Sequence, residues 1–528
     1  MESPAPGAMP PNAASADGRI LARNTLWNAA ATVWQGLALL ALVPYIVHRV
    51  GLEQYGIWVV LTAVVSYFDL ADVTGKIALG KFVAQYHAVG DRDSLASALD
   101  NGALFYALLI AAILAIGLAA RAPLFAILQI PLARQNEAAL VFGLALVAFC
   151  LSALGNIWSS VLAGLQRADV LAGVVSAATA LRLGATIWVL ESGWGLRGLA
   201  LVEIVIAFAS LLALMVCARK VYPLLRVRPW RFERAMMKRI AGFGAQLNMS
   251  SAAEIIQMQL DKVLLSRYMG VQFVAFYDLG TRLLRYARGF LLSMVAPLAP
   301  VAAHLTAQNQ RARLASLART GGKAMAFMAI GVFGALFLTA PKLLALWVGH
   351  DYPLAVATMR ILCFGFAFNV LTGVGFFLAN GAGRPEFQAR TSGWQTVLNL
   401  VLSVILIRSL GFLGAPLATS LAMSAGALGF LASWGKSSDL PLGFFLRHAV
   451  AQPFCIAVIA NCALWIAGEK WLVPTSRAML GVCLLIEIVA FVALYVGLLK
   501  AVRFWTDEEK SALRRHLPAR LGRWAGQL

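Results

Sequence analysis

Charged side chains, and acidic ones above all, are scarce in this chain. Only 13% of its 528 residues are charged, and 24 Asp and Glu stand against 44 Lys and Arg, which gives a formal net charge of +20. Apolar residues make up 60% of the sequence, and the mean hydropathy is +0.77. A soluble globular domain is far more polar, so the composition predicts an all-α polytopic membrane protein.

Cysteine and histidine are few as well. The six cysteines all lie in apolar stretches, none forms a Cys-x-x-Cys pair, and the six histidines are scattered. These patterns argue against a disulfide framework and against a zinc site, so the cysteines are expected to be small packing residues. We expect no metal and no other cofactor.

Long polar intervals are missing, which leaves no room for a separate soluble domain. Hydropathy predicts fourteen transmembrane spans, and most basic residues fall in alternate loops, so the positive-inside rule places both termini in the cytoplasm. That alternation indicates membrane topology and contact with anionic lipids, and argues against nucleic-acid binding. The spans are expected at residues 25–47, 54–78, 101–120, 138–162, 169–190, 197–217, 242–267, 272–299, 323–347, 354–379, 391–410, 413–434, 449–467 and 478–500.

The two halves of the chain resemble each other. A shift of 219 residues lays Gly51 on Gly270, Arg92 on Arg311, and one Leu-Ala-Ser triplet on another. Six spans per repeat would make both repeats point the same way, which predicts two six-helix lobes around a central cavity, plus two extra C-terminal helices.

This repeat defines the expected domain organisation. The basic linker contains interleaved aromatic residues, which favours a helix in the cytoplasmic interface, and a solvated linker is the alternative. The predicted parts are a disordered cytoplasmic N-tail (1–23), an N-lobe (24–217), a basic amphipathic linker (218–240), a C-lobe (241–436), spans thirteen and fourteen (437–500), and a basic cytoplasmic tail (501–528).

The stretch from Glu254 to Arg288 carries the sharpest functional signal. It is predicted to form two apolar helices joined at Met269-Gly270, with Asp278, Arg282 and Arg285 along one face. A charge at mid-bilayer costs roughly 2.5–3.5 kcal/mol, so this pattern favours the wall of a polar cavity for an anionic ligand. Structural pairing, of Asp278 with Arg282 or of Asp261 with an arginine of the next helix, is the alternative. The cations outnumber the carboxylates, however.

Two segments resemble a known family. Residues 51–95 contain a Gly-x-x-x-Tyr-Gly turn, an Asp near the end of the second span and a Gly-Asp before a Leu, and residues 261–300 have matching features. They are similar to bacterial polysaccharide-transport flippases, whose superfamily includes multidrug extrusion proteins and lipid II flippases. One departure is Asp69-Leu70-Ala71-Asp72, where relatives commonly have Asp-Leu-Gly.

This resemblance implies a non-enzymatic function: translocation of undecaprenyl-diphosphate-linked oligosaccharide across the bacterial inner membrane by alternating access. Arginine suits a diphosphate headgroup because its guanidinium is planar and permanently charged. Two lysines of the second span are expected at the cytoplasmic mouth, unless they are snorkelling anchors. The headgroup candidates are Arg282, Arg285, Arg288, Lys76 and Lys81.

Coupling to H⁺ or Na⁺ would require a carboxylate in the cavity. The candidates are Asp69, Asp72, Glu254, Asp261 and Asp278. Expected partners are the lipid-linked oligosaccharide, anionic membrane lipids and the polysaccharide polymerase or export machinery. The alternatives are a drug or cation antiporter of the same fold, a lipid II-type flippase, and a membrane glycosyltransferase or polymerase. The arginines argue against the antiporter, and the short loops argue against the enzyme.

Overall fold

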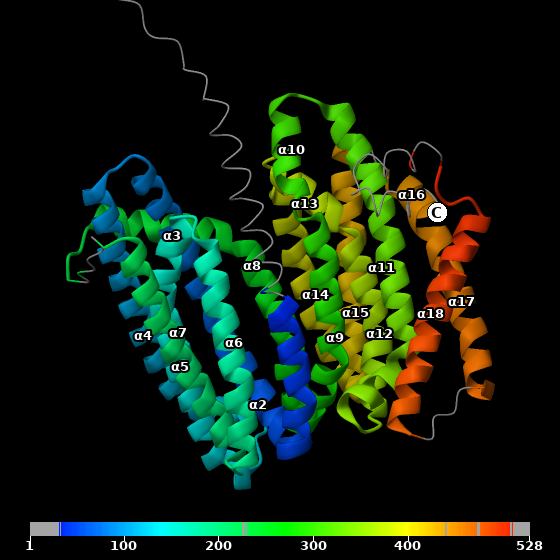
Figure 1. The fold of residues 1–528 in the computed structure, drawn as a ribbon, viewed down its shortest axis with the longest axis horizontal. Helices are drawn as coiled ribbons and strands as arrows, with labels where there is room; N and C mark the ends of the chain where they lie inside the picture. Colours follow the sequence, from blue (N-terminus) through cyan, green and yellow to red (C-terminus); the bar gives the residue numbers. More distant parts are fainter. Residues whose placement is uncertain are drawn as a thin grey trace, which may run out of the picture. The chain divides into compact units, whose positions relative to one another are not determined.

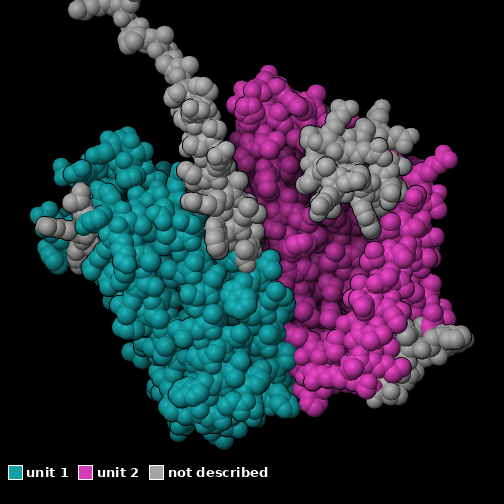
Figure 2. Space-filling view, viewed as in Figure 1, with its two compact units in different colours: residues 1–255 teal, residues 256–528 magenta. Residues whose placement is uncertain are grey.

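The computed structural model describes residues 33–223, 230–438, 441–471 and 476–506, together with residues 31, 228 and 509. The predicted N-tail and most of the basic C-terminal tail lie outside these residues. Every regular element in the described part is helical, which confirms the all-α fold. The chain divides into two compact units, residues 1–255 and 256–528 (Figure 2).

The first unit contains a helix at Val33–Val50 and the elements up to the first half of α8 (Figure 1). Helix α5 packs against α3 and α7, and α6 packs against α7. An apolar core centred on Leu79, Leu99 and Tyr106 holds this unit together. Its elements are α2 (Leu52–Val65), η1 (Ser66–Phe68), α3 (Asp69–Ala88), α4 (Arg92–Ile127), η2 (Leu132–Arg134), α5 (Gln135–Gly164), α6 (Ala168–Glu191), α7 (Gly195–Val221) and α8 (Arg234–Met269).

In the second unit, α12 packs against α9, α11 and α15, and the two last helices pack against α11. The division between the units falls inside α8, and the domain boundaries expected from the sequence stay a prediction. Its elements are α9 (Val271–Val295), α10 (Leu298–Ala307), α11 (Arg311–Val348), α12 (Pro353–Leu371), α13 (Gly373–Gly381), α14 (Glu386–Leu410), η3 (Gly411–Leu413), α15 (Gly414–Ser437), α16 (Leu442–Phe445), a π-helix η4 (Leu446–Val450), α17 (Ala451–Trp471) and α18 (Arg477–Ala501).

Twelve helical segments of the described chain are long and apolar enough to cross a membrane. The segment Glu386–Lys436 contains both α14 and α15, and therefore accounts for two of the predicted spans. The predicted span 242–267 lies in α8 and is not among the twelve, since its second half carries several polar residues, among them Asp261 and Lys262. The protein is a multi-pass membrane protein.

The helix boundaries repeat between the two units. Gly51 and Gly270 lie 219 residues apart, precede α2 and α9, and have φ values of 82° and 103°. Such angles are available to glycine at little cost, which explains why this residue recurs at both turns. The segments Leu52–Ala88 and Val271–Ala307 that follow are both 37 residues long, and α4 and α11 also begin 219 residues apart. The predicted internal repeat is therefore present in the helix boundaries.

Between α7 and α8 the structure differs from the interfacial helix predicted over 219–240. The residues described between the two helices form turns and coil, because two prolines in this interval interrupt a helix. The carboxylate of Asp100 accepts a hydrogen bond from the backbone N–H of Arg228, and the Asn101 amide oxygen accepts one from that of Glu233 at 2.9 Å. The linker is thus fixed to the first turns of α4.

Candidate functional site

A buried carboxylate organises the charges of α8 and α9. Asp278 has no exposed surface and forms ion pairs with Lys262 at 3.1 Å, Arg282 at 2.7 Å and Arg285 at 3.0 Å. Arg282 donates through both Nε and Nη2 to the same carboxylate oxygen, Oδ2. The pairing alternative is therefore present, yet three cations share this one carboxylate.

Asp261 forms a second polar centre beside the first. Its side chain is almost fully buried and accepts hydrogen bonds from the hydroxyl groups of Tyr277, Ser403 and Thr419. Thr419 in turn accepts a hydrogen bond from the amide nitrogen of Asn399 at 2.9 Å. The carboxylate expected to pair with an arginine is thus surrounded by hydroxyl groups from α9, α14 and α15.

A small cavity of about 20 Å³ lies between the two centres. Asp261, Lys262, Tyr277, Arg285 and Thr419 are among the side chains that line it. This space is about sufficient for one water molecule. The second unit therefore brings a carboxylate, two cations and two hydroxyl groups around one small polar space.

Close helix packing explains the burial of Asp278. A Cβ atom at Gly280 would lie 2.5 Å from the carbonyl oxygen of Ala355, so α9 and α12 approach each other at backbone distance. One turn beyond Arg285, Arg288 donates through Nε to the amide oxygen of Asn369 on α12 at 2.7 Å. Arg288 therefore points to α12, whereas Arg282 and Arg285 point to Asp278.

The first unit has a larger polar cavity of its own, about 690 Å³ in volume. Asp69 and Lys76 line it together with Asn156, and Arg182 and Glu203 form an ion pair of 2.8 Å in its wall. Arg182 and Glu203 were each expected to satisfy a polar group of another helix or to serve transport, and they satisfy each other.

The remaining candidates from the sequence lie in different surroundings. Asp72 is buried and accepts a hydrogen bond from the Asn156 amide at 2.7 Å. The ammonium group of Lys81 lies 3.5 Å from the centre of the Phe243 ring, an arrangement typical of a cation–π contact. Glu254 is exposed and belongs to the first unit, so it does not share the unit of Asp261 and Asp278.

Several residues of the site escaped sequence reasoning. Lys262 stood beside Asp261 in the sequence without any sign that it reaches Asp278. Ser403, Thr419 and Asn399 carry no charge and lie more than a hundred residues from Asp261, and buried hydroxyl groups are common in packed membrane helices. Within the described chain, no group of three or more His, Cys, Asp and Glu side chains could hold a metal ion.

A model of the polysaccharide biosynthesis protein family matches residues 50–357, more than half of the sequence. The chain belongs to this family. A protein of Shigella flexneri named "Putative O-antigen transporter" is 21% identical over 417 residues, which cover 77% of this chain and 96% of the relative. An uncharacterized membrane protein of Methanocaldococcus jannaschii is 23% identical over 212 residues, but the match covers only 39% of this chain and 40% of that protein.

Solved structures show the same fold. The lipid II flippase MurJ in an inward closed conformation aligns with a TM-score of 0.72 at 14% identity, over 90% of this chain and 99% of its own. An inward-facing multidrug resistance transporter aligns with a TM-score of 0.64 at 18% identity, over 79% of this chain and 95% of its own. The resemblance identified in the sequence is confirmed, and the chain is a membrane transporter or flippase of the polysaccharide biosynthesis family.

Proposed function

We propose that this protein translocates undecaprenyl-diphosphate-linked oligosaccharide across the bacterial inner membrane for the assembly of surface or exopolysaccharide. Beyond family membership, the proposal rests on one observation: Lys262, Arg282 and Arg285 gather around Asp278 inside a membrane-embedded unit. A diphosphate group leaving water requires charge-assisted donors, and arginine offers them in a planar fork.

The ion pairs with Asp278 hold the arginines in position for an incoming anion. A guanidinium group has five N–H donors, and Arg285 commits one of its nitrogens to Asp278 at 3.0 Å. The same side chain lines the small cavity, together with Lys262. In the proposed cycle the diphosphate displaces part of the carboxylate contacts, and Asp278 reclaims the arginines after release.

The test is export by Arg282→Ala and Arg285→Ala variants, with Arg→Lys variants at the same positions. The Ala variants should abolish polysaccharide export at normal membrane abundance, and the Lys variants should retain part of it because they keep the charge. Arg134→Ala is the control, since Arg134 forms a half-exposed ion pair with Glu137. Full export by the Ala variants would remove the headgroup role.

Substrate identity requires a deletion strain. Lipid-linked oligosaccharide should accumulate on the cytoplasmic side of the inner membrane while surface polysaccharide is lost. Unchanged glycolipid, combined with altered sensitivity to cationic drugs, would instead support a cation exporter of the same fold. In this proposal both termini lie in the cytoplasm, and a polysaccharide polymerase or the export machinery receives the product.

We further propose that Asp261 couples transport to H⁺ or Na⁺. Asp261 offers two carboxylate oxygens within a shell of hydroxyl groups, and the Asn399 amide oxygen beside Thr419 is buried with no hydrogen-bond partner among the described residues. Hard oxygen donors of this kind suit a small cation, and a buried carboxylate suits a proton.

Asp261→Asn tests the coupling by removing the charge at nearly constant shape. Purified wild-type protein should bind ²²Na⁺ in equilibrium dialysis if Na⁺ is the coupling ion, and the variant should not. If H⁺ is the coupling ion, transport should respond to an imposed pH gradient in the wild type only. Unchanged transport by Asp261→Asn under both gradients would exclude this residue.

A further inference from the structure

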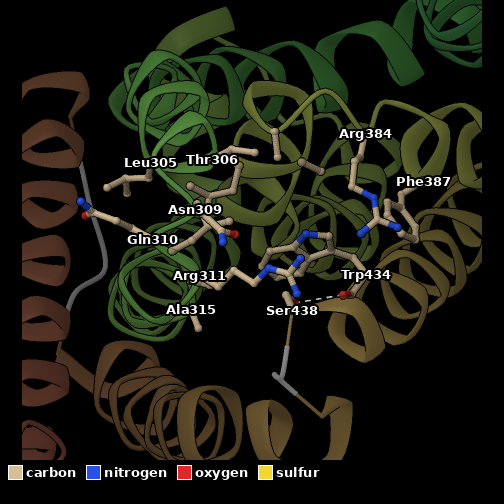
Figure 3. Close-up of a pocket in the computed structure, with 15 residues that line it drawn as sticks. Leu305, Thr306, Asn309, Gln310, Arg311, Ala315, Arg384, Phe387, Trp434 and Ser438 are labelled. Carbon is tan, nitrogen blue, oxygen red and sulfur yellow. Dashed lines mark hydrogen bonds between the residues drawn. The ribbon is translucent and has the colours of Figure 1, made fainter.

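A second large pocket lies in the second unit, away from Asp261 and Asp278. Its volume is about 580 Å³, and it lies where the α10–α11 turn, the α13–α14 turn and the end of α15 meet (Figure 3). The side chains that give it its chemistry are Arg311, Arg384, Asn309, Ser438, Trp434 and Phe387. No carboxylate is among the residues that line it.

The two arginines are placed by different elements. Arg311 begins α11 and reaches toward Trp434 and Ser438, whereas Arg384 ends the turn before α14 and lies along Phe387, 4.8 Å from the centre of its ring (Figure 3). The Ser438 hydroxyl donates a hydrogen bond to the Trp434 carbonyl oxygen at 2.9 Å. The pocket thus combines two permanent cations, polar side chains and two aromatic faces.

The internal repeat provides a comparison for these charges. In the first unit Arg92 follows Asp91, and Arg167 makes two contacts with Asp169, at 3.0 and 3.1 Å. Arg311 is the counterpart of Arg92 at the same 219-residue shift, and an uncharged glutamine precedes it in place of the aspartate.

Arg384, the counterpart of Arg167, makes a weaker ion pair. A single contact of 3.3 Å joins it to Glu386, and both side chains are half exposed. An exposed pair of this kind contributes about 0–1 kcal/mol, so it competes poorly with a strong anion. The second repeat has therefore lost acidic compensation at the loops that form the pocket.

We propose that this pocket binds a phosphate-bearing anion, held by Arg311 and Arg384 and assisted by the amide of Asn309 and the hydroxyl of Ser438. Two arginines can hold one phosphate group through several charge-assisted hydrogen bonds. A volume of 580 Å³ exceeds that of phosphate alone and leaves space for a group attached to it. The phosphate can come from an anionic lipid headgroup or from solution.

This inference does not depend on the proposed transport function. The loops involved belong to the basic set that the sequence assigns to the cytoplasmic side, where anionic headgroups attract basic residues. Binding here is measured without transport, so loss of one activity and loss of the other are distinguishable.

The experiment uses the full-length protein in detergent with two probes. Native mass spectrometry compares adducts of phosphatidylglycerol and phosphatidylcholine from an equimolar mixture, and equilibrium dialysis measures [³²P]phosphate. The variants are Arg311→Gln and Arg384→Gln, and the matched control is Arg92→Gln at the equivalent position of the first repeat. Each of the two variants should weaken binding by about tenfold or more, because each loses charge-assisted hydrogen bonds.

The outcomes separate the two sources. Preferential binding of phosphatidylglycerol that falls in both pocket variants and persists in Arg92→Gln supports a lipid headgroup. The same pattern with [³²P]phosphate, without preference between the lipids, supports a free phosphate compound. If neither probe binds, or if Arg92→Gln weakens binding as much as the pocket variants do, the proposal is overturned.

Discussion

Replacement of Asp278 by asparagine should be strongly destabilising although the change is nearly isosteric. The Asp278 side chain has no exposed surface, and Lys262, which it pairs with at 3.1 Å, is only 7% exposed. Loss of one partner from a buried ion pair costs about 3–5 kcal/mol, because the other charge stays buried without compensation. Arg282 and Arg285 are 21% and 26% exposed, so they can turn toward water and reduce the penalty. We therefore expect a loss of about 3 kcal/mol, at the lower end of that range.

The free energy of unfolding can be measured by titration with SDS in mixed micelles, followed by circular dichroism. The informative comparison adds Lys262→Met and the double variant Asp278→Asn/Lys262→Met. The double variant should recover much of the loss, since it removes the most deeply buried cation together with the carboxylate. Glu137→Gln is the control, and its exposed pair with Arg134 should contribute less than about 1 kcal/mol.

Two results would refute this reasoning. Asp278→Asn could unfold at the same SDS fraction as the wild type, which would mean that the carboxylate does not compensate the cations. The double variant could instead lose the sum of both single losses, which would mean that Lys262 and Asp278 do not interact.

Two further predictions concern packing and capping. Gly280→Ala should cost about 1–3 kcal/mol, because the new Cβ would lie 2.5 Å from the Ala355 carbonyl oxygen, whereas Gly289→Ala on the same helix meets nothing within 4 Å and should stabilise; SDS titration of both variants checks this. Asp91 accepts hydrogen bonds from Ser94, which lower the pKa of its carboxyl, so its contribution to α4 is present above about pH 4 and is lost as the pH falls through the lowered value. Hydrogen exchange in the first turn of α4, corrected for intrinsic rates, should therefore rise in Asp91→Ala and at low pH in the wild type; an unchanged rate would contradict the cap.

The sequence predicted those parts of the fold that depend on local signals. Hydropathy located the spans, and Gly51 and Gly270 marked equivalent turns because a positive φ favours glycine whatever surrounds it. The contact between Asp278 and Arg282 follows from a spacing of four residues on one helix. Each of these signals is complete within a short segment.

Contacts between distant segments could not be predicted in this way. Ser403 and Thr419 lie 142 and 158 residues from Asp261, and nothing in their local sequence distinguishes them from other buried hydroxyl residues. The interfacial helix over 219–240 was inferred from interleaved basic and aromatic residues, a pattern that two long helices ending near a linker produce equally well.

The charges around Asp278 are not a requirement of the fold, because the first repeat builds the equivalent helices without them. The 219-residue shift aligns each charged position with an apolar or small one, and Val43 and Val59 are buried apolar residues in the first unit. The aligned pairs are Lys262 with Val43, Asp278 with Val59, Arg282 with Ala63, and Arg285 with Ser66.

A variant that carries all four residues of the first repeat should separate folding from function. Replacement of a buried ionic group by apolar residues is often neutral or stabilising by about 1–4 kcal/mol, because no charge is left to desolvate. The quadruple variant Lys262→Val/Asp278→Val/Arg282→Ala/Arg285→Ser should therefore reach the membrane and unfold at or above the SDS fraction of the wild type, yet export no polysaccharide. Failure to accumulate in the membrane would show that the charges serve the fold, and export at the wild-type rate would show that they serve neither.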